Sequence, residues 1–424
     1  MERYGDVLLI AIPGFIVLMI IEAVYGWYTG KQTFRGFDTI SSLSSGYTNT
    51  IKDVLKLTIV VIGYSWLEGR ISLIKIEDTI WVYVLTFIAL DFAGYWSHRL
   101  AHTLNIFWNK HIIHHSSEEF NLACALRQTI SNIFGIHAIF LIPAALIGLP
   151  PKVIATLAPI HLFLQFWYHT RHIPKLGLLE YIIVTPSLHR VHHAINPEYL
   201  DKNFSQIFII WDRLFGTLQE ELDDVPPIYG VKRAVNTWNP FKINFQHLWL
   251  LIQDAWRTEK WTDKLRLWFM PTGWRPEDVK IKYPVKIIDD PYSQVKFSTE
   301  TTPKLLAWSW FQHAATFAMI IHMILFLADI GSPAIFVYGV FILVSVYSYT
   351  SLMDREQGAL LVELIRSLSG LGIIYMTGDW FLINTALPGG MFLVSGYFIL
   401  SMLVVAYFVL FDFSKKPSLT AAST

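Results

Sequence analysis

Apolar residues in this chain gather into runs that are long enough to cross a membrane. A spanning helix needs about 20 mostly apolar residues, and residues 7–28 and 79–96 supply two such runs near the N-terminus. Further apolar runs follow near the C-terminus, at residues 305–327, 333–349, 360–375 and 380–411. The pattern predicts membrane helices at both ends of the chain, with a more polar region between them.

The stretches between these runs are less regular. Residues 31–53 are rich in Ser, Thr and Gly, which predicts a polar loop or an interfacial segment, and residues 54–66 are apolar but short, which predicts a tilted or re-entrant helix. The apolar runs 130–149 and 153–168 are separated by Gly148-Leu149-Pro150-Pro151, a sequence that breaks a helix. We expect a hairpin there that turns inside or across the membrane.

A mixed region with an aqueous character follows from residue 171 to 302. Within it, residues 241–267 carry several tryptophans and predict one or two amphipathic helices that lie against lipid headgroups. The pattern divides the chain into N-terminal membrane helices at 1–90, a central region at 91–300, C-terminal membrane helices at 301–413 and a polar tail at 414–424.

Composition agrees with an all-α, multi-pass integral membrane protein. Charged residues make up 16% of the chain and hydrophobic residues 53%, whereas about 25% of the residues are charged in soluble proteins. The formal net charge of +0 gives no reason to expect nucleic acid as a partner. One cysteine, Cys124, is too few for an iron–sulfur cluster or a zinc ribbon, each of which needs about four thiolates.

Histidines carry the candidate chemistry, because twelve of the fifteen lie between positions 98 and 193. Residues three or four apart share one face of a helix, so a cluster with this spacing presents its imidazoles to a common point. The clusters are His98 and His102, then His111, His114 and His115, and finally His189, His192 and His193, with His169 between the last two. The first cluster continues from the apolar run 79–96, so we expect a metal site just outside the membrane surface.

The number of histidines indicates two metal ions. Imidazole suits zinc, copper, iron and nickel, but a structural zinc site uses four ligands, and nine are present here. The zinc-protease motif HExxH is absent from the sequence. We interpret the pattern as a pair of irons with mostly nitrogen ligands and open positions for dioxygen.

Nearby carboxylates could orient such ligands. Asp91 lies seven residues before His98, two helical turns back on the same face, where it could accept the second ring N–H of a metal ligand. Glu118 and Glu119 follow the second cluster, and Asp201 follows the third. A solvated or helix-capping role is an equally good interpretation of each carboxylate.

Several longer runs carry a family resemblance. Residues 95–102 have the sequence Tyr-Trp-Ser-His-Arg-Leu-Ala-His, residues 111–122 His-Ile-Ile-His-His-Ser-Ser-Glu-Glu-Phe-Asn-Leu, and residues 209–217 Ile-Ile-Trp-Asp-Arg-Leu-Phe-Gly-Thr. Together with Thr185-Pro186-Ser187 and Asp201-Lys202-Asn203, these runs resemble the fatty acid hydroxylase/sterol desaturase superfamily and, within it, the alkylglycerol monooxygenases. The matching motifs extend from Asp91 to about Trp274.

The resemblance implies a membrane di-iron enzyme in which the nine histidines hold two Fe ions that use O2 on a lipid taken from the bilayer. It implies hydroxylation of the ether-linked alkyl carbon of a glyceryl ether lipid, which gives a hemiacetal that splits into an aldehyde and glycerol. An external electron donor is needed, and tetrahydrobiopterin is the one that the resemblance implies. The residues predicted to be catalytic are Asp91, Glu118, Glu119, Asn121 and Arg127.

One departure concerns the residues after His169-Thr170, where the family typically has an acidic residue and this chain has Arg171-His172. We therefore do not predict His172 to be a ligand. Arg127 and Arg190 could hold a polar headgroup or pair with carboxylates, and the apolar hairpin 130–168 is a candidate wall for the lipid chain, with plain membrane packing as the alternative.

Two other functions stay open at this point. One is a fatty acid, sterol or carotenoid hydroxylase or desaturase that a small electron-transfer protein reduces. The other, from a different class, is a metal-binding membrane transporter. Lys and Arg are frequent in the histidine region, and the tail adds Lys415 and Lys416, so the active site should face the cytoplasm. The membrane would be the endoplasmic reticulum in a eukaryote or the inner membrane in a bacterium.

Overall fold

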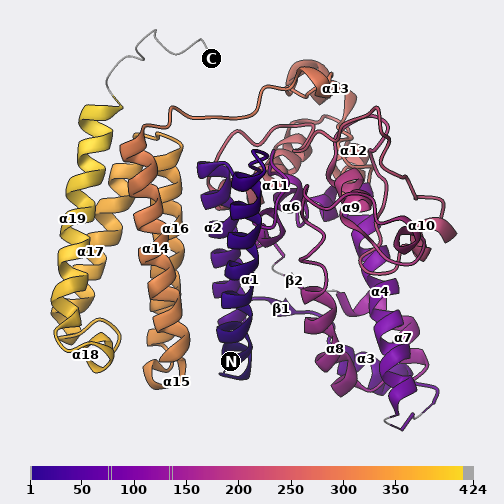
Figure 1. The fold of residues 1–424 in the computed structure, drawn as a ribbon, viewed down its shortest axis with the longest axis horizontal. Helices are drawn as coiled ribbons and strands as arrows, with labels where there is room; N and C mark the ends of the chain where they lie inside the picture. Colours follow the sequence, from indigo (N-terminus) through magenta and orange to yellow (C-terminus); the bar gives the residue numbers. More distant parts are fainter. Residues whose placement is uncertain (1, 75, 78, 133, 136, 414–424) are drawn as a thin grey trace.

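The structure is a computed structural model that describes residues 2–74, 76–77, 79–132, 134–135 and 137–413. It is helical, with two groups of helices on either side of α1 (Glu2–Tyr28) and α2 (Gly36–Val54) (Figure 1). One group is a C-terminal bundle of long helices, α14 (Pro303–Leu325), α16 (Ala334–Met353), α17 (Ala359–Thr377) and α19 (Gly390–Tyr407). The short helices α15 (Leu327–Ile330) and α18 (Ile383–Ala386) lie at one end of that bundle.

The other group surrounds α4 (Ile80–Thr103) and contains mostly short elements. These are α3 (Tyr64–Ile71), α5 (Asn105–Trp108), α6 (Ile112–His115), α7 (Ile142–Leu146), α8 (Pro151–Phe163), α9 (Pro186–His193), α10 (Ile210–Leu214), α11 (Pro240–Arg257), α12 (Trp261–Arg266) and α13 (Glu277–Lys282). Two-residue strands β1 (Ile59–Val60) and β2 (Phe134–Gly135) pair in parallel.

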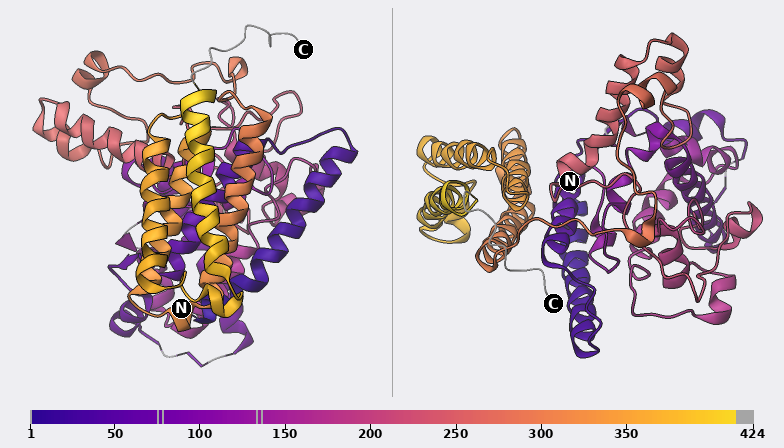
Figure 2. Two further views of the ribbon diagram at one scale, coloured as in Figure 1. Left: turned by 90° about the vertical axis from the view of Figure 1, so that its left-hand side faces the viewer. Right: turned by 90° about the horizontal axis from the view of Figure 1, so that it is seen from above.

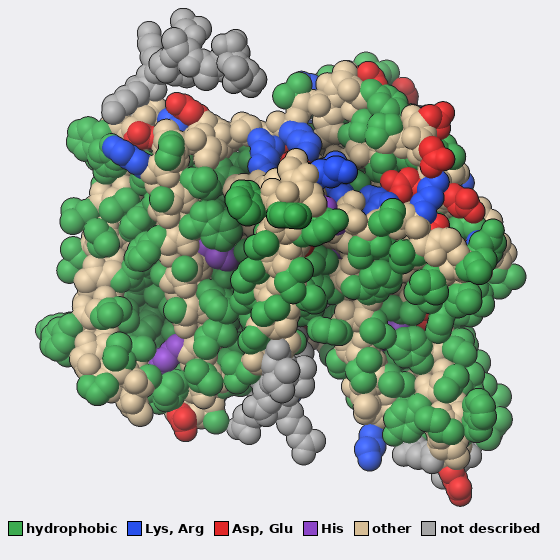
Figure 3. All heavy atoms as spheres, viewed as in Figure 1, with side chains coloured by type: hydrophobic (Ala, Val, Ile, Leu, Met, Phe, Trp, Pro, Cys, Tyr) green, Lys and Arg blue, Asp and Glu red, His purple; other side chains and the backbone are tan. Residues whose placement is uncertain are grey.

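Among the described residues, five helices are long and apolar enough to cross a membrane. They are Ala11–Tyr28, Ile80–Thr103, Ala334–Met353, Ala359–Thr377 and Gly390–Asp412. The multi-pass prediction is therefore confirmed. The expected continuation of the run 79–96 is also confirmed, because α4 carries both His98 and His102. On the face shown in Figure 3, charged side chains gather along one edge, and apolar side chains cover most of the area below it.

The prediction of a polar loop at residues 31–53 was wrong, because α2 fills most of that segment. Its hydroxyl groups find partners inside the protein: Ser44 Oγ donates to Ile40 O over 2.5 Å, and Ser41 Oγ donates to Trp238 O over 2.8 Å. Small hydroxyl residues let neighbouring helices approach closely, and α2 packs against α14 and α16. The Ser- and Thr-rich composition therefore reflects helix packing and not a loop.

The predictions of a helix at residues 54–66 and of helices in the hairpin arms were also wrong in part. Val54 ends α2, and the β-branched residues that follow form the strand β1, as extended backbone suits them. Residues 130–149 contain β2, a 3₁₀ segment at His137–Leu141 and the short α7 in place of one long helix. The break before α8 is confirmed, with Gly148 at a φ of 72°.

Close packing and a buried ion pair hold the C-terminal bundle together. On α17, Glu363 accepts from Arg366 over 2.6 Å, and both side chains are almost fully buried. Glu363 also accepts from Ser348 on α16 over 2.7 Å, and Arg366 donates to Ser401 on α19 over 3.0 Å, so the pair joins three helices. Isolated charges are costly inside a membrane protein, and they occur in pairs that satisfy each other. Gly370 on the same helix faces the ring of Phe398 on α19 so closely that an added Cβ atom would collide with it.

The predicted amphipathic helices at residues 241–267 are confirmed as α11 and α12. They extend to one side of the molecule (Figure 2), and their exposed residues include Trp249, Trp256, Trp261 and Leu265. Their contact with lipid headgroups stays a prediction.

Candidate metal centre

Four segments bring the nine predicted histidines into one place. Helix α4 supplies two of them, the segment that ends in α6 supplies three, and α9 supplies three, while His169 follows α8 in a turn. They form two groups, and the ring nitrogens of each group lie within 4.8 Å of one another. One group contains His98, His102, His111, His115 and His192, and the other contains His114, His169, His189 and His193.

The two groups are in contact with each other. The imidazoles of His115 and His193, one from each group, stack with their ring centres 4.2 Å apart. Within the first group, Nε2 of His111 lies 2.9 Å from Nε2 of His98 and 3.0 Å from Nε2 of His115. Within the second, Nε2 of His189 lies 2.9 Å from that of His169 and 3.0 Å from that of His193. Each of the two groups has the donor atoms to hold a metal ion.

Main-chain carbonyls determine which ring nitrogen faces the centre. A carbonyl oxygen only accepts, so a ring nitrogen bonded to it carries the proton, and the other nitrogen of a neutral imidazole keeps its lone pair. Nδ1 of His98, His114, His169 and His192 donates to the carbonyls of Phe204, Arg127, Gln165 and Lys202, over 2.7, 3.3, 3.0 and 2.9 Å. All four imidazoles therefore turn the Nε2 lone pair inward.

These inward lone pairs need a cation. Nε2 of His114 and Nε2 of His169 lie 3.3 Å apart, and two acceptors at that distance repel each other. Burial lowers the pKa of both imidazoles, that of His114 to about 4, so neither is protonated at neutral pH. Among the described residues, Nε2 of His102 and of His192 is buried without a hydrogen-bond partner. The donor set fits metal ions that accept imidazole, iron among them.

The carboxylate of Asp212, which was not among the predicted site residues, supports this centre. Asp212 is fully buried and accepts from the main-chain N–H groups of Phe204 and Ser205, each over 2.8 Å, and from Thr217 Oγ1 over 2.6 Å. Because the Phe204 carbonyl accepts from His98, Asp212 fixes the orientation of that imidazole through the main chain. Its place in the Trp-Asp-Arg run was the available signal.

The contact expected for Asp91 was wrong. The carboxylate accepts from Nε2 of His161 over 2.8 Å, from the main-chain N–H groups of Ile207 and Phe208, and from Trp211 Nε1. His161 lies outside both histidine groups. Asp91 therefore joins α4 to α8 and to the segment before α10, and it holds the wall of the centre in place.

The other polar residues predicted to be catalytic also lie outside the two groups. Glu118 accepts from Phe297 N over 2.5 Å, and Glu119 pairs with Lys296 over 2.6 Å, so both hold the segment that leads to α14. Asn121 donates to Thr33 O over 2.7 Å. The sequence placed these residues next to the second cluster, but their side chains bond to residues of other segments.

Arg127 and Arg190 pair with carboxylates. Arg127 donates to Asp38 over 2.8 Å, and Arg190 donates to Glu221 over 2.6 Å, and both arginines are buried. The main-chain oxygen of Arg127 also accepts from His114. The alternative of a carboxylate partner is thus the one that the structure supports. His172 lies outside both groups, with its ring against Tyr25.

A second residue without an assigned role in the sequence analysis, Glu22, attaches α1 to the centre. Its carboxylate accepts from Leu122 N over 2.7 Å and from Thr170 Oγ1 over 2.5 Å. Thr170 directly follows His169, so the apolar helix α1 is fixed to the segment that carries a centre histidine. A single carboxylate inside an apolar run was the signal that could have identified it.

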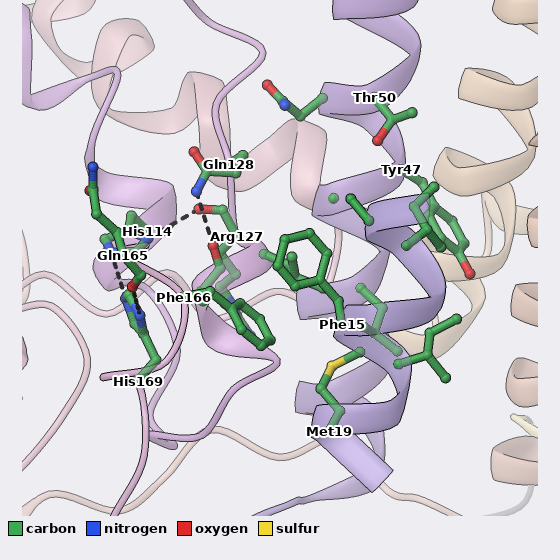
Figure 4. A pocket seen from close by; sticks show the side chains of 18 of the residues that line it. Phe15, Met19, Tyr47, Thr50, His114, Arg127, Gln128, Gln165, Phe166 and His169 are labelled. Carbon is green, nitrogen blue, oxygen red and sulfur yellow. Dashed lines mark hydrogen bonds between the residues drawn. The ribbon is translucent and has the colours of Figure 1, made fainter. Parts of the chain in front are cut away.

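A cavity of about 810 Å³ opens next to the histidines. Phe15 and Met19 from α1, Phe166, and Tyr47 from α2 line it together with His114 and His169 (Figure 4). Helix α14 contributes a further wall, and the hairpin region contributes residues 159–169 in part. Several apolar lining residues, among them Ile20, Leu162 and Phe163, are also exposed, so the apolar wall of the cavity continues to the surface of the protein.

Comparisons with known proteins agree with this arrangement. The family model described as fatty acid hydroxylase matches residues 83–217, which hold all nine histidines. Human alkylglycerol monooxygenase is 33% identical over 89% of this chain and 84% of its own length. The Xenopus tropicalis alkylglycerol monooxygenase is 35% identical over 86% of this chain and 82% of its own length. The chain belongs to the alkylglycerol monooxygenase family.

A further match covers a smaller part of the chain. An ornithine lipid hydroxylase from Rhizobium tropici is 33% identical over 32% of this chain and 40% of its own length. Matches to the alkylglycerol monooxygenase family extend well beyond the part that the fatty acid hydroxylase model covers, so most of the membrane helices belong to the shared sequence. No solved structure gives a significant match.

Proposed function

We propose that the protein is a membrane monooxygenase in which the nine histidines hold two iron ions and that oxidises the ether-linked alkyl carbon of a glyceryl ether lipid. Membership of the alkylglycerol monooxygenase family supports the substrate class and the reaction. The opposed lone pairs of His114 and His169 support a metal at the centre. The division of the histidines into two touching groups supports two ions.

The reaction balances with one dioxygen and two electrons from outside. One oxygen atom enters the C–H bond next to the ether oxygen, and the other leaves as water with two protons. The resulting hemiacetal breaks its bond between carbon and the ether oxygen, which gives an aldehyde and a free glycerol hydroxyl. When bound, the iron pair supplies the open coordination positions and the electrons with which dioxygen is activated.

The residues of this chain position the reactants. Four carbonyls on three segments keep the Nε2 atoms directed at the centre, so little reorganisation would be needed when ligands exchange. The apolar wall of α1, with Phe15, Ile16 and Met19, receives the alkyl chain and excludes water from the oxidising centre. A lipid held against that wall presents the carbon next to its headgroup to the histidine side of the cavity.

Tetrahydrobiopterin is our proposed source of the electrons. The sequence carries no flavin fingerprint, haem signature or set of iron–sulfur cysteines, so the electrons come from a separate molecule. We further propose that the centre faces the cytoplasm, where a soluble reductant can reach it, and that the membrane is the endoplasmic reticulum or a bacterial inner membrane. The basic residues near the centre support that orientation.

Metal analysis and product analysis test the proposal together. We expect purified protein to contain about two irons per chain and to release a fatty aldehyde from a 1-O-alkylglycerol when dioxygen and tetrahydrobiopterin are present. His114→Ala and His192→Ala each remove a ligand from one group and should lose iron and activity. His172→Ala, a histidine outside both groups, is the matched control and should keep its iron. One metal or fewer per wild-type chain, or full activity in either ligand variant, would contradict the two-iron centre.

A further inference from the structure

The cavity next to the histidines has one charged side chain without a counter-charge. Among the described residues, Asp53, Lys110 and Arg127 are the charged residues, histidines aside, that line it. Asp53 pairs with Lys52 over 3.3 Å and accepts from Asn49 over 2.9 Å. Arg127 pairs with Asp38 over 2.8 Å. These two lining charges are therefore neutralised within the protein.

Lys110 differs from both. In the described part of the chain, its ammonium group forms no ion pair. It makes a cation–π contact with Phe107, with Nζ 5.4 Å from the ring centre. The residue is half-buried and directly precedes the centre histidine His111. Partial burial of an ammonium group without an anionic partner is unfavourable, and a ligand that carries a negative charge would remove that cost.

The lining beside Lys110 is polar, and the opposite wall is not. Asn49, Thr50, Gln128 and Thr129 also line the cavity. Ser131 Oγ donates to the main-chain oxygen of Asn109, the neighbour of Lys110, over 3.0 Å, and Lys52 donates to Thr129 O, so the segment 128–131 lies between Asn109 and α2. In Figure 4, Gln128 and Thr50 lie on one part of the cavity, away from Phe15 and Met19 on α1. A ligand that fits both parts has a charged or polar head and an apolar chain.

We infer that Lys110 binds an anionic oxygen of the substrate headgroup, so that a glyceryl ether lipid with a phosphate on its glycerol is preferred over the uncharged alkylglycerol. The inference rests on the proposed function for the substrate class. The position of Lys110 next to His111 places the bound phosphate beside the centre, and the glycerol joins it to the ether carbon that reacts. A charge-assisted hydrogen bond to phosphate is stronger than one to a neutral hydroxyl, which accounts for the preference.

The test compares two lipids and two lysine variants. With wild-type protein, kcat/KM for 1-O-alkylglycerol 3-phosphate should exceed that for 1-O-alkylglycerol. Lys110→Gln should reduce the ratio of the two values by about tenfold or more, since the phosphate loses a charged partner. Lys286→Gln is the matched control, because Lys286 is exposed and does not line the cavity, and it should keep the wild-type ratio.

Binding provides a readout that does not depend on turnover. The same lipids, added to purified protein in detergent, should raise the melting temperature of the wild type more with the phosphate than without it, and Lys110→Gln should remove the difference. Glycerol 3-phosphate without an alkyl chain is a third ligand. If it stabilises the wild type as much as the phosphorylated lipid does, Lys110 belongs to a free-anion site and the lipid-headgroup inference is overturned.

The two proposals fail in different ways. If Lys110→Gln keeps the wild-type preference in both assays while the aldehyde is still formed, the headgroup inference is wrong and the proposed function stands. If neither lipid is oxidised but the phosphorylated lipid binds more tightly through Lys110, the proposed function is wrong and the headgroup site stands.

Discussion

Backbone carbonyl groups, and not carboxylates, orient most of the histidines whose partners are defined in this centre. A carbonyl that is fixed by its own segment cannot change its protonation, so the imidazole it holds keeps one tautomer. The carbonyl of Phe204 depends in turn on Asp212, which holds the N–H groups of Phe204 and Ser205. Asp212 thus orients His98 indirectly, through the main chain at Phe204.

Asp212→Asn tests this arrangement. The amide keeps one acceptor oxygen but turns an NH2 group toward a main-chain N–H, so we expect a loss of about 1–3 kcal/mol of stability and a lower iron content. Melting temperature and iron per chain measure the two effects. Asp223→Asn is the control, because Asp223 is exposed and pairs with Lys175 at the surface. Unchanged iron and stability in Asp212→Asn would show that the loop holds Phe204 without this carboxylate.

At the residue scale, the sequence predicted the histidines better than their neighbours. Eight of the nine members follow from spacing along helices, which fixes the relative direction of side chains within a few residues, whereas His169 stands alone between two clusters. The partners of Asp91 and Glu118 lie in distant parts of the chain, at residues 161 and 207–211 for Asp91 and at residues 294–297 for Glu118. Local spacing carries no information about such distant segments.

At the scale of elements, apolar length predicted α1, α4, α16 and α17 because lipid requires it. Helix α2 escaped prediction since its surface is covered by other helices and needs no apolar face toward lipid. Its residues Ser44 and Thr48 are fully buried and bond to carbonyls one turn back. A helix that is surrounded by protein therefore looks like a loop in a hydropathy pattern.

Helix α17 offers a matched pair of glycines for testing the packing of the C-terminal bundle. A Cβ atom at Gly370 would collide with the Phe398 ring, whereas nothing lies within 4 Å of a Cβ atom at Gly372. Gly370→Ala should destabilise the protein by about 1–3 kcal/mol, as overpacking does elsewhere. Gly372→Ala should be neutral or slightly stabilising, because alanine has a higher helix propensity than glycine.

Thermal unfolding of the two variants in the same detergent measures the difference. Equal melting temperatures for both variants would show that α17 and α19 separate easily and that the Phe398 contact contributes little.

At the scale of the whole molecule, the two described ends of the chain lie at opposite ends of the structure. Helix α1 begins at the end of the molecule away from the histidines, whereas α19 reaches the end where α6 and α9 lie (Figure 1). In the orientation that we propose from the positive-inside rule, the histidine end faces the cytoplasm. The lower region that holds α3, α7 and α8 then lies toward the far side of the membrane.

Reporter fusions at both ends check this orientation. In a bacterial host, green fluorescent protein fused to the C-terminus should fluoresce, whereas the same protein fused to the N-terminus should be exported and stay dark. Alkaline phosphatase should be active at the N-terminus and inactive at the C-terminus. Fluorescence at the N-terminus together with phosphatase activity at the C-terminus would place the histidine centre outside the cytoplasm.

The exposure of Ile20, Leu162 and Phe163 on the rim of the cavity affects how the enzyme meets its substrate. A lipid that passes this rim never enters bulk water, so its relevant concentration is the mole fraction in the bilayer. Diluting the membranes with buffer leaves that fraction unchanged, whereas adding inert phospholipid lowers it. We therefore expect the rate per enzyme to fall when inert phospholipid is added and to stay the same when the membranes are diluted with buffer.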